Sequence, residues 1–341
     1  MNTNHMFKKI QYLLIICILS LFIFGCLSFQ ADELNTVTFI ACGDLHIQRK
    51  SQTHIKDFLK AIYALKQEPL VWQKNHFASG NILAPQSIII AGDLTETNLL
   101  GINKGRVSLK YYNSIKSMIK KKHNINVYEI WGNHDYPPVS SNIFSVKDYI
   151  TKINPYRYGI SNYSKNGHYS WENKFIHFIH LNLKASNTIQ KNQKNRNPYN
   201  ALTYLKNDLQ MNTRTTNKKV IIVQHYGFMG SNYDGDEWWT DQELEILKKI
   251  LYPFKNNIIA IIHGHYHNTF SYTREGYRIY NAGSPLHNNL NEKKYYSGRF
   301  LYFQISKKYM DVQDIFYGKN YKYSNPKWGP NYKSLGSVQI Y

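Results

Sequence analysis

The chain has 341 residues, of which 43% are hydrophobic, and its 29 tyrosines and 16 phenylalanines supply bulky side chains for a packed interior. This composition excludes a disordered chain, and the lack of any repeating period excludes a solenoid or a coiled coil. The formal charge of +20 favours anionic partners, namely phosphorylated small molecules, lipid headgroups or nucleic acid, without choosing among them. Short basic runs such as Lys120-Lys121-Lys122 are interpreted as solvated faces.

The first residues have the features of an export signal. Lys8 and Lys9 precede a nearly continuous apolar run, Ile10–Gly25, and Cys26 follows it. A basic start, an apolar stretch of this length and a small residue before the cut are typical of signal peptides. The run resembles a bacterial lipoprotein signal, in which residues 1–25 are removed and Cys26 is lipidated. An uncleaved membrane anchor is the alternative, because about 16 apolar residues are marginal for crossing a bilayer.

Both interpretations predict an exported domain that is held at the bacterial cell envelope by its N-terminus. With Cys17 removed and Cys26 acylated, Cys42 would be the one thiol of the soluble body. A single thiol cannot form an internal disulfide, so stability must come from the core or from bound metal. Cys42 ends an apolar run and is predicted to be buried.

From Asn35 onward, short apolar runs alternate with amphipathic stretches, which is typical of an α/β core. Several runs are continuously apolar, such as Ile88-Ile89-Ile90, as expected for strands that are buried on both faces. The expected strands are Thr36–Cys42, Ser87–Ala91, Asn126–Trp131, Lys174–Leu183, Lys219–Gln224 and Asn257–Ile262.

Helical patterns lie between these strands. Apolar residues recur with helical spacing from Ile55 to Ile62 and from Leu202 to Leu209. The sequence Thr240-Asp241-Gln242-Glu243 is a capping box that opens a helix, which Pro253 ends.

The C-terminal region has a different sequence pattern from the rest of the chain. A hairpin is expected at about 298–316, and we predict a single domain over 35–320 followed by a Tyr- and Lys-rich tail at 321–341. Long loops are expected at Ala185–Asn200 and Ser231–Trp238, and loops of this length in a compact domain are often functional.

Five short polar motifs directly follow predicted strands. Open α/β sheets place their ligand sites at the carboxyl ends of strands. Taken alone, each motif fits a turn or a core histidine better than a ligand site, but five in this order predict a metal centre. In chain order they are Asp44-Leu45-His46, Gly92-Asp93, Gly132-Asn133-His134-Asp135, His225 and Gly264-His265-Tyr266-His267.

This series resembles the calcineurin-like metallophosphoesterase superfamily, whose motifs are D-x-H, G-D, G-N-H-D or E, a lone His, and G-H-x-H. All five are present without substitution, and the resemblance runs from about Val37 to Pro285. It implies an α/β fold, a four-layer α/β/β/α sandwich of two mixed sheets flanked by helices. It also assigns ligands: the first metal takes Asp44, His46, Asp93 and His267, and the second takes Asp93, Asn133, His225 and His265.

The ligand types agree with this assignment. Imidazole and carboxylate together suit Zn, Mn or Fe. Two divalent ions with only Asp44 and Asp93 as charged ligands leave an excess of positive charge that attracts a phosphoryl group, and neutral Asn133 preserves it. Ions roughly 3.5–4 Å apart can hold a hydroxide for in-line attack at phosphorus.

Four neighbouring residues are expected to support this chemistry. The resemblance implies that His134 hydrogen-bonds the phosphoryl group or protonates the leaving oxygen. In related phosphatases an acid three residues after the bridging Asp orients this histidine, and Glu96 has that spacing. In purple acid phosphatases that position is a Tyr, so Glu96 argues against that branch. Asp135 and His263 are expected next to the ligands, although His263 also fits a core role.

The sequence indicates less about substrate specificity. The aromatic residues near His225 either wall a pocket over the metals or, as favoured for the two tryptophans, anchor the start of the capped helix; they are Tyr226, Phe228, Tyr233, Trp238 and Trp239.

The sequence predicts an exported two-metal phosphoesterase acting on a phosphate mono- or diester, such as a nucleotide, a sugar phosphate or a phospholipid headgroup. The alternatives are a non-catalytic metal-binding envelope module of the same fold and a nuclease. A nucleic-acid partner is disfavoured because no basic–aromatic binding motif is present. The oligomeric state, the metals and the substrate stay open.

Overall fold

The computed structural model describes most of the chain from residue 35 onward. The described residues are 35–48, 53–67, 70–72, 76–78, 80–96, 104–135, 146–153, 159–185, 197–213, 218–228, 239–285, 296–318 and 334–340, together with Ile15. The chain divides into two compact units, Met1–Thr36 and Val37–Tyr341. The expected signal peptide at 1–25 and Cys26 lie outside the described residues, apart from Ile15. None of the helices in the described part has the length and apolar character that a membrane span needs.

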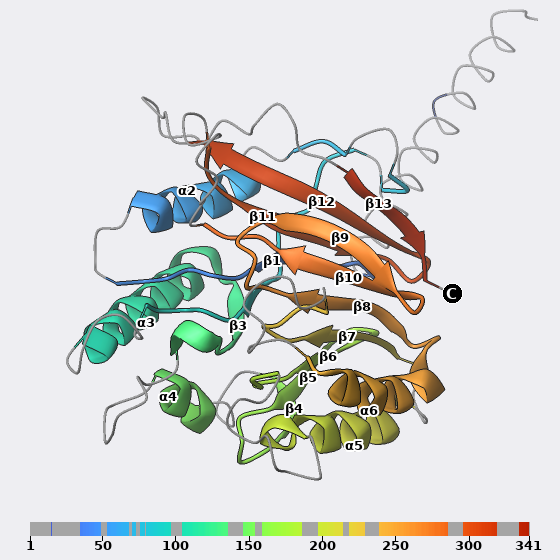
Figure 1. The fold of residues 1–341 in the computed structure, drawn as a ribbon. Coiled ribbons are helices and arrows are strands. Elements are labelled where there is room, and N and C mark those ends of the chain that lie inside the picture. Colours follow the sequence, from blue (N-terminus) through green and yellow to red (C-terminus); the bar gives the residue numbers. More distant parts are fainter. Residues whose placement is uncertain are drawn as a thin grey trace, which may run out of the picture. The chain divides into compact units, whose positions relative to one another are not determined.

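The second unit is built on two mixed β-sheets (Figure 1). The first contains β1 (Val37–Cys42), β2 (Ser87–Ala91), β3 (Asn126–Ile130), β11 (Tyr296–Ile305), β12 (Tyr309–Gly318) and β13 (Ser334–Gln339). Its order is β13-β12-β11-β1-β2-β3, in which β1, β2 and β3 run parallel and the other neighbouring pairs run antiparallel.

The second sheet contains β4 (Ile160–Tyr163), β5 (Tyr169–Asn173), β6 (Ile176–His180), β7 (Lys219–Val223), β8 (Ile258–His263), β9 (Thr269–Arg274) and β10 (Tyr277–Ala282). Its order is β4-β5-β6-β7-β8-β10-β9. The central strands β6, β7, β8 and β10 run parallel, and antiparallel pairs extend the sheet at both edges.

Within the described residues, five α-helices cover the outer faces of the sheets; they are α2 (Thr53–Gln67), α3 (Lys104–His123), α4 (Val146–Ile153), α5 (Ala201–Thr213) and α6 (Asp241–Leu251). Three separate apolar cores define four layers. One core joins α2, α3 and α4 to the first sheet, one lies between the sheets, and one joins α5 and α6 to the second sheet. The predicted α/β/β/α sandwich of two mixed sheets is therefore confirmed.

The alternation of side chains along β1 explains why this strand is apolar throughout. Phe39 and Ala41 point into the core between the sheets, whereas Ile40 and Cys42 point under the helices. Both faces are buried, as expected for a central strand. Cys42 is a free, buried thiol, in agreement with the sequence.

Helix α6 begins as the sequence predicts. The Thr240 side chain accepts a hydrogen bond from the Glu243 amide, and the Glu243 carboxylate accepts one from the Thr240 amide. The helix ends at Leu251, and the single turn Tyr252–Phe254 that follows contains Pro253.

Two sequence expectations differ from the structure. The expected strand Lys174–Leu183 begins only at Ile176, because Lys174 adopts a left-handed conformation (φ 55°) in the tight turn that joins β5 to β6. Within the region that we expected to be a tail, Ser334–Gln339 pairs with β12 as β13 and extends the first sheet. Neither a short turn without glycine nor an edge strand after a long connection leaves a clear sequence signal.

A buried carboxylate ties α5 to the edge of the second sheet. Asp208 accepts hydrogen bonds from Asn162 (3.0 Å), Ser170 (2.7 Å) and His177 Nε2 (2.5 Å). Burial alone would raise the pKa of Asp208, but the hydrogen bond and charge of His177 and the bonds from Ser170 and Asn162 lower it. The ionised form is therefore the form that stabilises the fold.

We expect Asp208→Asn to lower the free energy of unfolding at pH 7 by about 2–4 kcal/mol, because it removes a charged acceptor from buried donors. Since the pKa is depressed in the folded state, this stabilisation exists above the unfolded pKa and disappears as the pH falls through the folded pKa. Urea unfolding followed by circular dichroism at pH 7 and pH 3 should show the gap to the parent protein shrinking. An equal gap at both pH values would contradict this account.

Candidate metal centre

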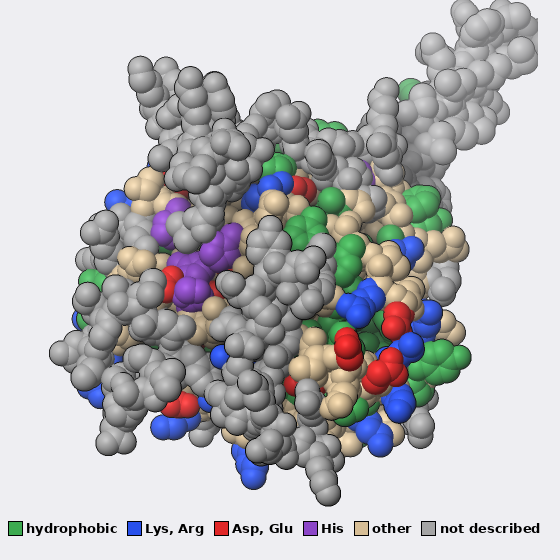
Figure 2. Space-filling model, in the orientation of Figure 1, with side chains coloured by type: hydrophobic (Ala, Val, Ile, Leu, Met, Phe, Trp, Pro, Cys, Tyr) green, Lys and Arg blue, Asp and Glu red, His purple; other side chains and the backbone are tan. Residues whose placement is uncertain are grey.

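The five polar motifs come together in space. β1, β2 and β3 of the first sheet and β7 and β8 of the second end at this place, and each is followed within five residues by candidate ligands. Among the described residues, the acidic and histidine side chains here form three groups that meet the geometric requirement for a metal site. Two of them share Asp93, namely Asp44, His46, Asp93 and His267, and Asp93, His225 and His265. The third consists of His46, Glu96 and His134. Figure 2 shows histidines gathered at one spot on the surface, with acidic side chains beside them.

The backbone around the cluster is strained. Five of the seven candidate ligands adopt left-handed backbone conformations, with φ between 44° and 76°; they are Asp44, His46, Asp93, His265 and His267. Such conformations cost about 1–3 kcal/mol each for residues other than glycine and concentrate at functional sites. The strain lets successive short motifs turn their side chains inward directly after the strands.

The first group is centred on two imidazoles. Nε2 of His46 and Nε2 of His267 lie 2.9 Å apart. Nε2 of His46 is 3.8 Å from the Asp93 carboxylate, and Nε2 of His267 is 3.7 Å from the carboxylate of Asp44. The backbone amide of His265 donates to both oxygens of Asp44 at 3.0 Å, which fixes this carboxylate.

The second group places three atoms within 3.2 Å of one another. His225 Nε2 lies 2.9 Å from Asn133 Oδ1 and 3.2 Å from His265 Nδ1, and Asn133 Oδ1 lies 3.0 Å from His265 Nδ1. The Asp93 carboxylate is 3.3 Å from His225 Nε2. Asn133, which the sequence assigned to the second metal, thus lies with the other members of that set.

The hydrogen bonds at the far side of the rings show what these atoms can bind. His225 Nδ1 lies 2.7 Å from the Ala91 carbonyl, which only accepts, so Nδ1 carries the hydrogen. Nε2 of His225 faces two acceptors, Asn133 Oδ1 and Asp93; burial would lower the pKa of His225, but the charge and hydrogen bond of Asp93 raise it to about 9. His46 is arranged in the same way, because its Nδ1 donates to Glu96 Oε2 at 2.5 Å while Nε2 faces His267.

Positive charge at Nε2 of His225 is therefore favoured, and either a proton or a bound cation can supply it. Neutral imidazole, carboxylate and amide oxygen are ligands of Zn, Mn and Fe. Burial and the charge of His225 lower the pKa of His265 to about 3, so this ring is neutral near pH 7. The donor set therefore fits divalent metal ions.

His134 and Glu96 form a pair beside the cluster. His134 Nδ1 donates to Glu96 Oε1, and the same carboxylate accepts from His46. Burial would lower the pKa of His134, but the hydrogen bond to Glu96 and the charges of Asp93 and Glu96 raise it to about 9. The opposing contacts lower the pKa of Glu96 to about 2, since the hydrogen bonds from both histidines outweigh its burial.

Asp135 holds two of the loops together. Its buried carboxylate accepts hydrogen bonds from the amides of Gly132 (2.9 Å), Leu94 (3.0 Å) and Thr95 (2.9 Å). These contacts connect the loop after β3 to the loop that carries Asp93.

His263 lies apart from both groups. Its side chain is fully buried, its Nδ1 donates to the Gly264 carbonyl at 2.9 Å, and burial lowers its pKa to about 4. A Cβ at position 227 would meet its ring, so the glycine there allows close packing. His263 is thus a core histidine, which was one of the two roles considered for it.

The loop that carries His267 is held from behind by residues that the sequence did not single out. Arg299 on β11 donates to the Asn268 side chain and, at 2.8 Å, to Asp314 on β12. Thr269 also donates to Asp314, at 2.5 Å, and the Arg299 guanidinium lies 3.9 Å above the Phe316 ring. No short motif marks these contacts, because Arg299 and Asn268 are 31 positions apart.

The aromatic residues near His225 belong to the core over the second sheet. Tyr226, Phe228 and Trp239 are all buried there, which agrees with the anchoring role favoured for Trp239. Tyr233 and Trp238 lie outside the described residues.

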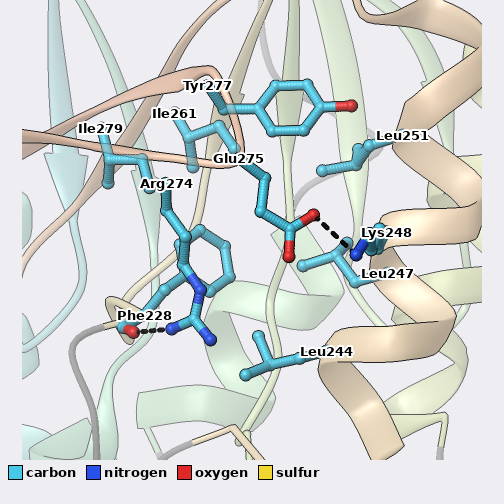
Figure 3. A pocket seen from close by; sticks show the side chains of 10 residues that line it. All are labelled: Phe228, Leu244, Leu247, Lys248, Leu251, Ile261, Arg274, Glu275, Tyr277 and Ile279. Atoms are coloured by element: carbon cyan, nitrogen blue, oxygen red, sulfur yellow. Dashed lines mark hydrogen bonds and ion pairs between the residues drawn. The ribbon is translucent and has the colours of Figure 1, made fainter. Parts of the chain in front are cut away.

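An apolar pocket of about 40 Å³ lies between α6 and the strands β8, β9 and β10. Figure 3 shows the side chains that line it, among them Phe228. The Lys248–Glu275 ion pair, with an N–O distance of 3.3 Å, lies beside it. None of the residues that line this pocket belongs to the metal-ligand groups.

The fold and the cluster together define a metal-dependent phosphoesterase. The family model of calcineurin-like phosphoesterases matches residues 37–269. The chain belongs to this family, and the resemblance seen in the sequence is confirmed.

Solved structures support the same fold. A dimetal phosphatase from Danio rerio superimposes with a TM-score of 0.56 at 12% identity, covering 89% of this chain and 98% of that chain. GAP50, described as the anchor in the inner membrane complex of Plasmodium, gives a TM-score of 0.50 at 11% identity, covering 88% of this chain and 89% of that chain. A comparison with curated proteins finds no match.

We expect Asp314→Asn to weaken binding of the ion assigned to Asp44, His46, Asp93 and His267 by about 10–100-fold, because it loosens the support of the His267 loop. Asp311→Asn is a matched control: Asp311 is equally buried on β12 but contacts Phe77, Ala78 and Ser337 instead. Metal dissociation constants from chelator competition show whether the two variants differ in metal affinity, and urea unfolding shows whether either one is destabilised. Equal metal affinities in both variants would contradict the positioning role.

Proposed function

We propose that this protein is an exported hydrolase of a small phosphate ester that uses two divalent ions. The observation that carries the proposal is the sharing of Asp93 by two ligand groups. We assign one ion to Asp44, His46, Asp93 and His267, and the other to Asp93, Asn133, His225 and His265. The name of the Danio rerio protein, a dimetal phosphatase, supports the number of ions.

Bound divalent ions would supply positive charge for the phosphate oxygens and an activated water as nucleophile. The residues of the chain have a different task, which is to hold that centre with few negative charges. Asn133 contributes a neutral oxygen where a carboxylate would cancel more of the charge. Asp44 and Asp93 are buried, so the local dielectric constant is low. A low dielectric constant would strengthen the attraction between bound ions and an anionic substrate.

We propose that His134 acts on the substrate. Its side chain is 29% exposed, so it can reach a bound molecule, whereas the side chain of His46 is only 3% exposed. Glu96 accepts the hydrogen of Nδ1 and fixes the orientation of the ring. The protonated ring can then donate a hydrogen bond to the phosphoryl group or a proton to the leaving oxygen.

Replacing His134 should therefore separate catalysis from metal binding. We expect His134→Gln to lower kcat for p-nitrophenyl phosphate by about 10²–10⁴-fold while two ions per chain remain bound. Asp93→Asn, in contrast, should lose both metal and activity, because Asp93 belongs to both groups. Activity assays combined with metal analysis by mass spectrometry test this. Full activity in either variant would refute the roles assigned here.

The ester class is the open part of this proposal. A small substrate such as a nucleotide, a sugar phosphate or a lipid headgroup fits an exported enzyme. Comparing p-nitrophenyl phosphate with bis-p-nitrophenyl phosphate in added Mn distinguishes monoester from diester hydrolysis. A panel of nucleotides, phospholipids, DNA and RNA under the same condition tests the nuclease alternative.

A non-catalytic envelope module is the rival function. GAP50 of Plasmodium, which is described as an anchor, shares this fold and is the reason to weigh such a role here. Against it, all seven candidate ligands are present here and gathered at one place, and His134 lies beside them. A module without turnover would have no use for an oriented, accessible histidine next to the cluster.

We also propose that the N-terminus anchors the domain outside the cytoplasm. The support is the basic start, the apolar run and Cys26 in the sequence. We expect Cys26→Ala to abolish lipid labelling and to leave the signal segment uncut, whereas the parent chain is shortened by 25 residues in intact-mass analysis. A parent chain that keeps its full length and takes up no lipid would favour the uncleaved anchor instead.

A further inference from the structure

The two helical layers of the second unit differ sharply in surface charge. Among the described side chains, the exposed positions of α5 and α6 carry three lysines and two acidic residues. The exposed positions of α2, α3 and α4, which we call the basic layer, carry eight lysines and arginines and a single acidic residue, Asp148. The eight cations are Lys56, Lys60, Arg106, Lys110, Lys120, Lys121, Lys122 and Lys152.

Helix α3 is the centre of the basic layer. Its 20 residues include no acidic residue. Arg106, Lys110 and Lys121 follow one another at helical spacing, so they lie along one stripe of the outer face. Lys116 is excluded from this stripe, since it is half-buried and bonds the buried Glu129 at 2.8 Å. The exposed cations are therefore not required to neutralise acids of the same helix.

Exposed apolar side chains lie beside the stripe. Val107 is 44% exposed and Met118 is 37% exposed, and their separation of eleven residues, three helical turns, puts them on the same side. The opposite face of α3 already supplies the core through Leu109, Tyr112 and Ile119. Cations with apolar side chains between them are the composition of helices that lie in a membrane interface.

We propose that the basic layer, with α3 at its centre, binds the surface of an anionic phospholipid bilayer. Charge complementarity supplies the attraction, which acts within a Debye length of the surface. A single-stranded nucleic acid would need aromatic side chains for base stacking. Tyr63, the one aromatic exposed among the described residues of these helices, packs near His123 with 5.7 Å between ring centroids. The proposal depends neither on the N-terminal anchor nor on catalysis.

The test is co-sedimentation of the full chain with vesicles of phosphatidylcholine alone and of phosphatidylcholine mixed with phosphatidylglycerol. Neutral vesicles report any binding through the N-terminal segment. Two triple variants have the same change in net charge: K110E/K121E/K122E on α3, and the control K206E/K248E/K249E on the opposite layer. Circular dichroism and thermal unfolding report whether each variant is folded.

We expect the parent protein to prefer the anionic vesicles, with the preference falling steeply as salt is added. The α3 variant should lose about 100-fold in its partition onto anionic vesicles and keep its binding to neutral ones, and the control should resemble the parent. Equal losses in both variants would show that net charge alone acts and would overturn the proposal. Displacement from the vesicles by a short RNA at matched phosphate concentration would overturn it in favour of nucleic acid.

Discussion

The metal centre depends on acceptor atoms that the fold gathers around a few imidazole nitrogens. His225 donates from Nδ1 to the Ala91 carbonyl, so its Nε2 faces Asn133 and Asp93, and Asp93 raises the pKa of the ring to about 9 despite its burial. His46 donates to Glu96 and meets His267 in the same manner. Such an arrangement favours positive charge among the acceptors, which protons or a pair of divalent cations can supply. The tautomers are thus decided outside the centre, by a backbone carbonyl and a carboxylate.

The two sheets make this arrangement possible. Their shared core fixes the carboxyl ends of β1, β2 and β3 relative to those of β7 and β8, and the candidate ligands follow directly. Left-handed backbone at Asp44, Asp93 and His265 costs free energy that the large buried cores offset. Close packing adds to this, since a Cβ on Gly132 would collide with Asp93 and His225. The site thus uses backbone conformations that its residues rarely adopt, and packing in the rest of the fold offsets their free-energy cost.

The sequence alone could predict many of the strands and the polar motifs because both rest on local signals, but it did not predict β4, β5, β9, β10 or β13, and the two-sheet arrangement came from the family resemblance. Continuous apolar runs mark strands such as β2 and β7, and each polar motif sits within a few residues of a strand end. Contacts between distant segments left no such signal. The Arg299–Asp314 pair behind the His267 loop joins β11, β12 and the loop before β9. No short sequence motif marks this contact. The left-handed turn at Lys174 was missed for a related reason, because lysine rarely adopts that conformation.

An experimental structure of the protein reconstituted with Mn, with anomalous scattering recorded, tests the central claim most directly. The account predicts two anomalous peaks per chain, both within bonding distance of Asp93. One peak should lie beside His46 and His267, and the other beside His225 and His265. A map with no peak among these side chains, or with peaks only elsewhere on the molecule, would contradict it.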